Sequence, residues 1–259
     1  MAAGTCPGAR GAFNASTVGR YETGDRIPRQ GDLRVLLDIY GVTGDERTAL
    51  LTLAREARQR GWWWPNRQAL KAGFDLYLGL EAEASALRIY HDQLIPGLLQ
   101  TEAYARGVIK AMNMTATEDE VEQLVHLRMT RQARLSGDDP LRLWAVLDEA
   151  LLNRPVGGPG VMRAQLRHLE ELSHRPNVTL QVLQSQIGAH PAMEGHFYLL
   201  EFPETSDPHM VYLELATSGL ALENAADVSR YTLIFGQLTA LALPPGASVR
   251  QIAAKATDR

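Results

Sequence analysis

The sequence of 259 residues is long enough for a small domain and a larger one, and its 45% hydrophobic and 22% charged residues are ordinary for a globular protein. No continuous apolar run reaches the length of a membrane span, and no secretory signal opens the chain. The single cysteine, Cys6, excludes an intrachain disulfide and a cysteine-based zinc site. These features predict a cytoplasmic protein with no membrane contact.

The net charge of −4 argues against a protein that coats nucleic acid by bulk electrostatics, but the charge is unevenly distributed. Residues 1–60 hold nine basic and seven acidic side chains, a net +2, which leaves −6 for the rest of the chain. A mildly basic head on an acidic body is compatible with a small DNA-contacting module joined to a domain that does not contact DNA.

Three short helices are predicted within residues 1–60. The first covers residues 14–24, between an asparagine suited to an N-cap and a glycine suited to a helix C-terminus. Asp32 is the predicted N-cap of the second helix, in which leucines recur at helical spacing. The third helix opens with the capping-box spacing of residues 43–46 and ends at Gly61.

Residues 61–80 form a predicted hinge that is rich in aromatic side chains. Three consecutive tryptophans do not suit a solvated linker, so at least one is expected to dock against the larger domain or a partner. A groove for a ligand or partner and ordinary packing are equally compatible with this composition. The candidate partner- or ligand-binding residues are Trp62, Trp63, Trp64, Phe74 and Tyr77.

Residues 81–259 alternate between strand-like and helical segments. The predicted strands, rich in β-branched and aromatic residues, cover residues 86–91, 141–147, 178–183, 196–202, 210–215 and 220–223. The predicted helices cover residues 101–112, 117–135, 160–174 and 225–241. This irregular interleaving predicts the fold class α+β, with a small all-α N-terminal domain, an incomplete helix-turn-helix, followed by a larger mixed-sheet α/β domain.

The helix predicted at residues 14–24 has the polarity of a recognition helix. Val18 and Tyr21 fall three residues apart and would pack inward, and the other side carries short polar side chains and a cation near its N-terminal end. Such side chains can reach base edges and phosphates from the major groove. The candidate DNA-binding residues are Asn14, Ala15, Ser16, Thr17, Arg20 and Arg26.

The run Ser-Thr-Val-Gly-Arg-Tyr-Glu-Thr-Gly, residues 16–24, resembles the third helix of Cro/repressor-type (xenobiotic-response-element family) helix-turn-helix regulators. Gly19 stands where that family has a serine. The resemblance implies that Glu22 packs back onto the domain and that Arg20 contacts the DNA backbone or the domain itself. Family members have two helices before this one, whereas a short unpatterned stretch precedes Asn14 here. We therefore expect an N-terminally truncated unit whose specific DNA binding is weak or absent.

Longer stretches resemble one actinobacterial, antitoxin-like branch of these regulators. The matching stretches are REARQRGWW (55–63), GLEAEASALRIYHDQLIPGLLQTEAYAR (79–106), LRLWAVLDEALLNRPVGG (141–158), NVTLQVLQ (177–184), YLELATSGLALE (212–223) and VSRYTLIFGQLTALAL (228–243). The resemblance implies a transcriptional regulator of a toxin–antitoxin system, encoded beside a small partner protein that behaves as the toxin.

His190, Glu194 and His196 could suggest a metal site. Their spacing fits no compact helical ligand motif, and the proline and glycine between them favour a loop that leads into a strand. The sequence therefore predicts no metal site and no cofactor.

Glu81 and Glu83, close to His91 and Asp92, could suggest acid–base chemistry, but a solvated helix start is the preferred interpretation. Asp148 follows a predicted strand, as active-site carboxylates often do, yet no nucleophile, phosphate loop or metal signature accompanies it. No catalytic residue is predicted, and the chain is not expected to be an enzyme.

The preferred function is an antitoxin-like transcriptional regulator in which a DNA-binding head, residues 1–60, is coupled to a partner- or ligand-binding domain, residues 81–259. The expected partners are double-stranded DNA, a small toxin-like protein encoded nearby and a second copy of the chain, because two recognition helices must reach successive major grooves. The alternative is an interaction module that sequesters the toxin-like protein without specific DNA binding.

Overall fold

The computed structural model describes Tyr21 and residues 30–58, 70–203 and 208–257. The chain divides into two compact units, the first made of Met1–Trp64 with Glu204–Asp207 and the second of Pro65–Pro203 with Pro208–Arg259. The candidate DNA-binding residues and the three tryptophans lie outside the described residues.

The first unit contains two described helices, α3 (Gln30–Ile39) and α4 (Gly44–Arg58). Leu36 and Leu37 of α3 and Leu51 of α4 are buried. The prediction of Asp32 as an N-cap is wrong, because α3 begins two residues earlier and Asp32 lies in its first turn. There the carboxylate is favoured by the positive end of the helix dipole and accepts a 2.7 Å hydrogen bond from the Tyr21 hydroxyl.

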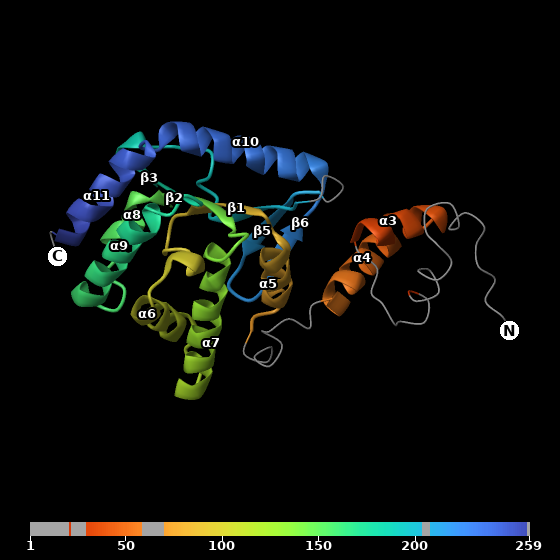
Figure 1. Ribbon diagram of the computed structural model, residues 1–259, viewed down its shortest axis with the longest axis horizontal. Helices are drawn as coiled ribbons and strands as arrows, with labels where there is room; N and C mark the ends of the chain where they lie inside the picture. The colour runs from red at the N-terminus through yellow and green to blue at the C-terminus, as the bar shows by residue number, and fades with distance from the viewer. Residues whose placement is uncertain (1–20, 22–29, 59–69, 204–207, 258–259) are drawn as a thin grey trace. The chain divides into compact units, whose positions relative to one another are not determined.

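The second unit is built on a six-stranded mixed sheet with the order β3-β2-β1-β4-β5-β6 (Figure 1). Its strands are β1 (Ala86–His91), β2 (Arg142–Asp148), β3 (Val178–Leu183), β4 (Phe197–Glu201), β5 (Met210–Glu214) and β6 (Gly219–Leu222). The first three pair in parallel, and each of the last three pairs antiparallel with its neighbours. The predicted fold class and mixed sheet are confirmed.

Connection lengths explain this division of the sheet. Parallel neighbours need a long crossover, which helices supply between β1 and β2 and between β2 and β3. The crossover helices are α6 (Glu102–Met112), α7 (Glu118–Arg131), α8 (Glu149–Asn153) and α9 (Pro159–Ser173). Short connections after β4 and β5 allow antiparallel pairing instead.

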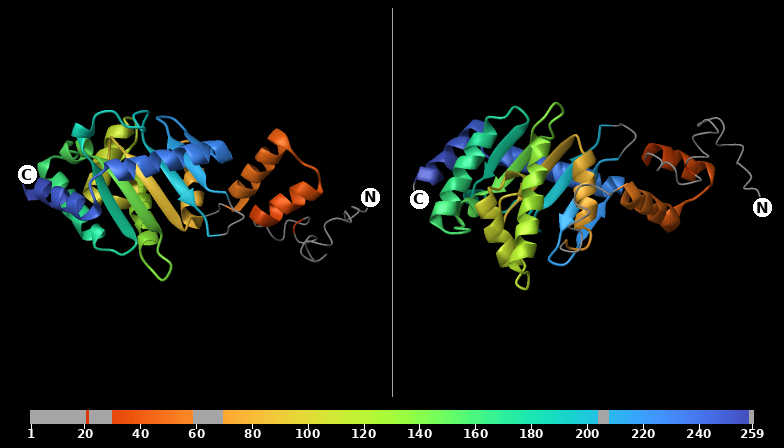
Figure 2. Two further views of the ribbon diagram at one scale, coloured as in Figure 1. Left: turned by 90° about the horizontal axis from the view of Figure 1, so that it is seen from above. Right: turned by 60° about the horizontal axis from the view of Figure 1, so that its bottom comes forward.

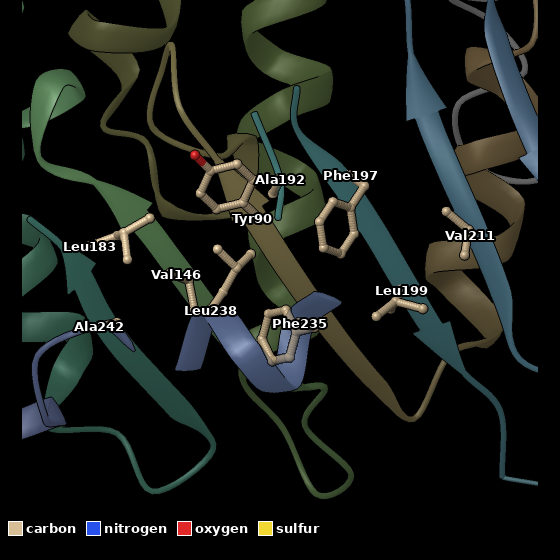
Figure 3. Close-up of a cluster of buried hydrophobic side chains, with 10 residues drawn as sticks. All are labelled: Tyr90, Val146, Leu183, Ala192, Phe197, Leu199, Val211, Phe235, Leu238 and Ala242. Atoms are coloured by element: carbon tan, nitrogen blue, oxygen red, sulfur yellow. The ribbon is translucent and has the colours of Figure 1, made fainter. Parts of the chain in front are cut away.

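One face of the sheet is covered by α10 (Ala225–Leu241), as Figures 1 and 2 show. Phe235 and Leu238 of this helix are buried against side chains from the central strands (Figure 3). The Phe235 ring meets Trp144 edge-on, with the ring centroids 5.7 Å apart. Because side chains alternate along a strand, this core uses only one of the two faces.

The opposite face carries α5 (Phe74–Glu83), α6 and α7 (Figures 1 and 2). The predicted hinge of residues 61–80 overlaps α5, so its second half is helical rather than a linker. Gly73 is the N-cap of α5, and its φ of 80° is costly for any residue with a Cβ. Thr117 and Glu120 form a capping box at the start of α7.

The sequence analysis also missed α11 (Pro245–Thr257), which packs on α9 and on the edge strand β3. Ser248 anchors it, since its hydroxyl accepts a 2.9 Å hydrogen bond from the Val182 amide. Among the described residues, no single helix is long and apolar enough to cross a membrane; α10 and α11, bent by 69° at their junction, meet that test of length and composition only as a pair.

Candidate ligand-binding site

A cavity of about 410 Å³ lies in the second unit, between the sheet face of β1, β4 and β5 and the helices α5, α6 and α7. This volume is in the range of small-molecule sites. One part of its wall is polar and charged, contributed by the strand ends and α7. Another part is apolar, contributed by α6 and α7. The cavity therefore offers two chemically different environments to one ligand.

The polar wall is organised around a buried ion pair between Glu81 and Arg131. Arg131 donates from Nε and Nη2 to the two carboxylate oxygens, at 2.8 and 2.6 Å. The Tyr77 hydroxyl donates a further 2.7 Å bond to Glu81. The guanidinium also lies over the rings of Phe74 and Tyr77, 5.4 and 5.3 Å from their centroids.

This ion pair corrects the interpretation of Glu81 as part of a solvated helix start. Glu81 is 2% exposed and Arg131 is 5% exposed. Glu81 lies in the last turn of α5, and 50 positions of sequence separate it from Arg131. No local pattern in the sequence reveals a partner that distant. Glu83, two residues later, is exposed.

Arg128 lies one turn before Arg131 on α7 and lines the same cavity. Burial and the neighbouring Arg131 lower its pKa to about 10, so the guanidinium is still charged at neutral pH. Its one hydrogen-bond partner among the described residues is the neutral Oε1 of Gln100, at 2.9 Å. A guanidinium carries five N–H donors. The Glu214 carboxylate partly opposes this lowering of the pKa, but its ion pair is with Lys71, at 3.1 Å. Arg128 is therefore a cation with spare donors and no direct salt bridge to a carboxylate in the described part of the chain.

His91, at the end of β1, adds a second unused polar group to this wall. It is 2% exposed, and its Nε2 lies 3.0 Å from the Tyr198 hydroxyl. Its Nδ1 is buried with no hydrogen-bond partner among the described residues. Burial, followed by the nearby His196 and Arg128, lowers the pKa of His91 well below its ordinary value. The imidazole is therefore neutral at pH 7.

His91, Asp92 and His196 bring potential metal ligands within 4.8 Å of one another. The two imidazoles are stacked, with centroids 4.4 Å apart and planes only 11° from parallel. Nitrogen lone pairs lie in the ring planes, so two nearly parallel rings do not converge on one ion as a tetrahedral site requires. Arg128 also places a positive charge nearby. The arrangement favours a stacked pair over a chelate.

The apolar wall comes from the facing sides of α6 and α7. Its side chains are Val108, Ile109, Met112, Leu124 and Leu127. Met112 is 47% exposed, and Leu215, which also lines the cavity, is 52% exposed. Exposed apolar side chains at a cavity wall are suited to contact with a ligand or a partner.

Only some of the described residues considered as functional candidates in the sequence line the cavity. Phe74 and Tyr77 line the cavity, although Tyr77 is almost fully buried and also supports the ion pair. Asp148 is the N-cap of α8 and accepts a bond from the Ala150 amide, which is a structural role. His190 lies outside the cavity lining, 3.4 Å from the Tyr90 hydroxyl, whereas His196 lines it.

The sequence analysis missed Arg128, Arg131, Gln100 and Tyr198. A signal existed for the two arginines, because residues three apart on a helix share a face and a predicted helix covered both. The sequence did not reveal that one arginine has a carboxylate partner and the other has none.

The family described as "Domain of unknown function (DUF5753)" matches residues 74–254. The chain belongs to this family. The match begins at α5 and contains nearly every residue that lines the cavity, so the cavity is a feature of the DUF5753 domain. A second match, described as "Helix-turn-helix domain", covers residues 8–50 and thus the whole predicted recognition helix. Comparisons with curated proteins and with solved structures gave no match.

The helix-turn-helix match supports a DNA-binding regulator as the coarse function of the chain. The predicted recognition helix is thus part of a recognised DNA-binding domain. The assignment to the actinobacterial antitoxin-like branch stays a prediction.

Proposed function

We propose that this chain is a transcriptional regulator whose affinity for DNA depends on the occupant of the cavity in its DUF5753 domain. The helix-turn-helix domain supports the DNA-binding half of the proposal. The cavity, with one charged and one apolar wall, supports the ligand-binding half. Catalysis is not proposed, and we expect the cavity to bind its occupant without turnover.

The observation that carries the proposal is Arg128. Holding a guanidinium in a partly enclosed wall without a carboxylate costs free energy, as its lowered pKa of about 10 reflects. Arg128 is partly exposed, and a charge that is partly withdrawn from water is stabilised by pairing with a counter-charge. The pairing is completed for Arg131 by Glu81, and for Lys71 by Glu214 at 3.1 Å. A bound ligand would complete it for Arg128.

Coupling between the two domains requires that the occupant binds more tightly to one state of the chain than to another. Energetic coupling of this kind is typically about 1–3 kcal/mol, which changes affinity by roughly 5- to 150-fold. A homodimer is part of the proposal, because a dimer presents two recognition helices to successive major grooves. The occupant would alter the geometry or spacing of these helices.

The antitoxin-like function is a second candidate, in which the occupant is a segment of a small partner protein. Met112 and Leu215, both about half exposed, favour it, since a protein segment would cover apolar side chains that a small ligand leaves in water. The alternative without DNA binding, simple sequestration of the partner, uses the same surface. Binding of DNA distinguishes it from the two regulator functions.

The proposal is tested by filling the cavity with a side chain. Leu124→Trp on α7 would occupy the apolar side of the cavity in the full-length chain, and Leu233→Trp on α10, where Leu233 is 67% exposed, is the matched control. Fluorescence anisotropy measures the affinity of each protein for a labelled duplex from upstream of its own coding sequence. We expect Leu124→Trp to change the Kd at least about 5-fold and the control to leave it unchanged.

Equal Kd values for Leu124→Trp and the control would contradict control by the cavity. Absence of saturable, sequence-dependent binding by every variant would contradict the regulator and favour sequestration. Far-UV circular dichroism of Leu124→Trp verifies that it folds. If it does not fold, Val108→Phe on the facing wall of α6 provides the smaller filling substitution.

A further inference from the structure

We propose that the natural occupant of the cavity is a small amphipathic monoanion, a molecule with one carboxylate and an apolar tail. This inference rests on the proposed function and names the ligand class of the same site. Arg128 and His91 would hold the carboxylate. The apolar wall of α6 and α7 would hold the tail.

Charge pairing in the cavity wall points to a single negative charge on the ligand. Three cationic side chains line the cavity, and two of them are paired with carboxylates: Arg131 with Glu81, and Lys71 with Glu214. Arg128 is the cation that remains without such a partner among the described residues. One carboxylate would neutralise it, whereas a dianion would leave a surplus negative charge in a partly enclosed site, at a cost in free energy.

The unused hydrogen-bond donors of Arg128 and His91 also suit a carboxylate. Arg128 has donors beyond the one used by Gln100, and a planar guanidinium matches the two oxygens of a carboxylate. His91 Nδ1 is a buried nitrogen without a partner among the described residues. When Nε2 accepts from the Tyr198 hydroxyl, Nδ1 carries the proton and can donate it to an anion. Both side chains line the same cavity, and the charge of Arg128 contributes to the lowered pKa of His91.

The tail is inferred from the other wall. Five apolar side chains on two adjacent helices line it, next to Arg128 on α7. Each buried methylene of a tail contributes about 0.8 kcal/mol on transfer from water. A compact polar anion, such as acetate, would leave this wall uncovered and would bind weakly.

Isothermal titration calorimetry on the full-length chain tests the ligand class with decanoate as the probe. Decanol and decyltrimethylammonium are the controls, because they keep the tail and replace the anion with a neutral or a cationic head. We expect decanoate to bind with one site per chain. The other two compounds should bind at least about 10-fold more weakly, the difference expected for a charge-assisted hydrogen bond.

Arg128→Gln removes the charge and should weaken decanoate binding by roughly 10- to 100-fold. Arg128→Lys keeps the charge without the planar fork, so its loss should be smaller. The matched control is Arg142→Gln on β2, which removes an exposed positive charge away from the cavity and should leave the Kd unchanged. Retained circular dichroism and a retained unfolding midpoint show that a weaker variant is folded.

Equal affinity for the three probes, or equal loss in Arg128→Gln and Arg142→Gln, would overturn the monoanion. Tighter binding of decyltrimethylammonium would overturn it as well. If decanoate binds through Arg128 but leaves the DNA affinity unchanged, the ligand class stands and the proposed coupling to DNA fails. If Leu124→Trp changes the DNA affinity and decanoate does not bind, the proposed function stands and the ligand class fails.

Discussion

Two arginines one turn apart on α7 show how different the roles of identical side chains can be. Arg131 has a bidentate carboxylate partner, a neighbouring tyrosine that bonds the same carboxylate, and two aromatic rings beneath its guanidinium. Arg128 donates a hydrogen bond to one neutral oxygen, the side-chain amide oxygen of Gln100. The first arginine is satisfied by the fold, and the second is available to a ligand.

The buried pair makes Glu81 a residue on which stability depends. Glu81→Gln keeps the size of the side chain but leaves the Arg131 charge buried without a counter-charge. Removing one partner of such a pair costs about 3–5 kcal/mol. Urea unfolding of the full-length chain should therefore show a lower midpoint for this variant.

Glu83→Gln is the matched control for Glu81→Gln, because Glu83 is exposed on the same helix. Its free energy of unfolding should stay within about 0.5 kcal/mol of the parent chain. Similar midpoints for the two variants would show that the ion pair does not stabilise the domain.

Residue spacing alone could have revealed that Arg128 and Arg131 share a helix face, but not which of them is paired. Glu81 lies fifty positions away, and its carboxylate reaches Arg131 only because α5 and α7 lie on the same side of the sheet (Figure 1). Likewise, the stacking of His91 on His196 depends on the antiparallel pairing of β1 with β4. Local patterns therefore pointed to Phe74 and Tyr77, which line the cavity, but did not reveal the ion pair or the histidine stack.

At the scale of elements, β-branched composition was sufficient for β3, which is buried on both faces, and helical period was sufficient for α10, which has one buried face. The predicted strand at residues 178–183 and the predicted helix at residues 225–241 coincide with β3 and α10. By contrast, α5 has buried residues on all sides, so its run FDLYLGL has no amphipathic period to read. The small residues of α11 gave too weak an apolar stripe for prediction, although Ile252 is fully buried.

The face of the sheet opposite the cavity supplies the main test of packing. Phe235 of α10 is 2% exposed and contacts the ring of Trp144. It also contacts the ring of Phe197 (Figure 3). Phe235→Ala would leave a cavity beneath the helix and should lower the free energy of unfolding by about 3–5 kcal/mol. Urea unfolding measures this loss.

Leu233→Ala tests whether that loss is specific to the packed face. Leu233 lies two residues before Phe235 on α10 and is 67% exposed. Its replacement should change the free energy of unfolding by no more than about 0.5 kcal/mol. A loss as large as that of Phe235→Ala would mean that α10 does not pack as described.

At the scale of the whole molecule, the chain joins a helix-turn-helix domain to a DUF5753 domain that contains a partly charged cavity. The proposed function needs a receiving site and an output, for which the cavity and the helix-turn-helix domain are the candidates. Coupling between two sites is reciprocal. If an occupant of the cavity changes the affinity of the chain for DNA, then DNA must change the affinity of the cavity for that occupant by the same free energy.

Because of this reciprocity, the proposed coupling between the cavity and DNA can be tested without knowledge of the ligand. Hydrogen exchange of backbone amides, measured on the full-length chain with and without saturating DNA from upstream of its own coding sequence, compares the cavity helices with a reference region. We expect DNA to change the protection of residues 102–131, which contain α6 and α7, and to leave residues 159–183, which contain α9 and β3, unchanged. Changes confined to residues 1–60 would contradict it.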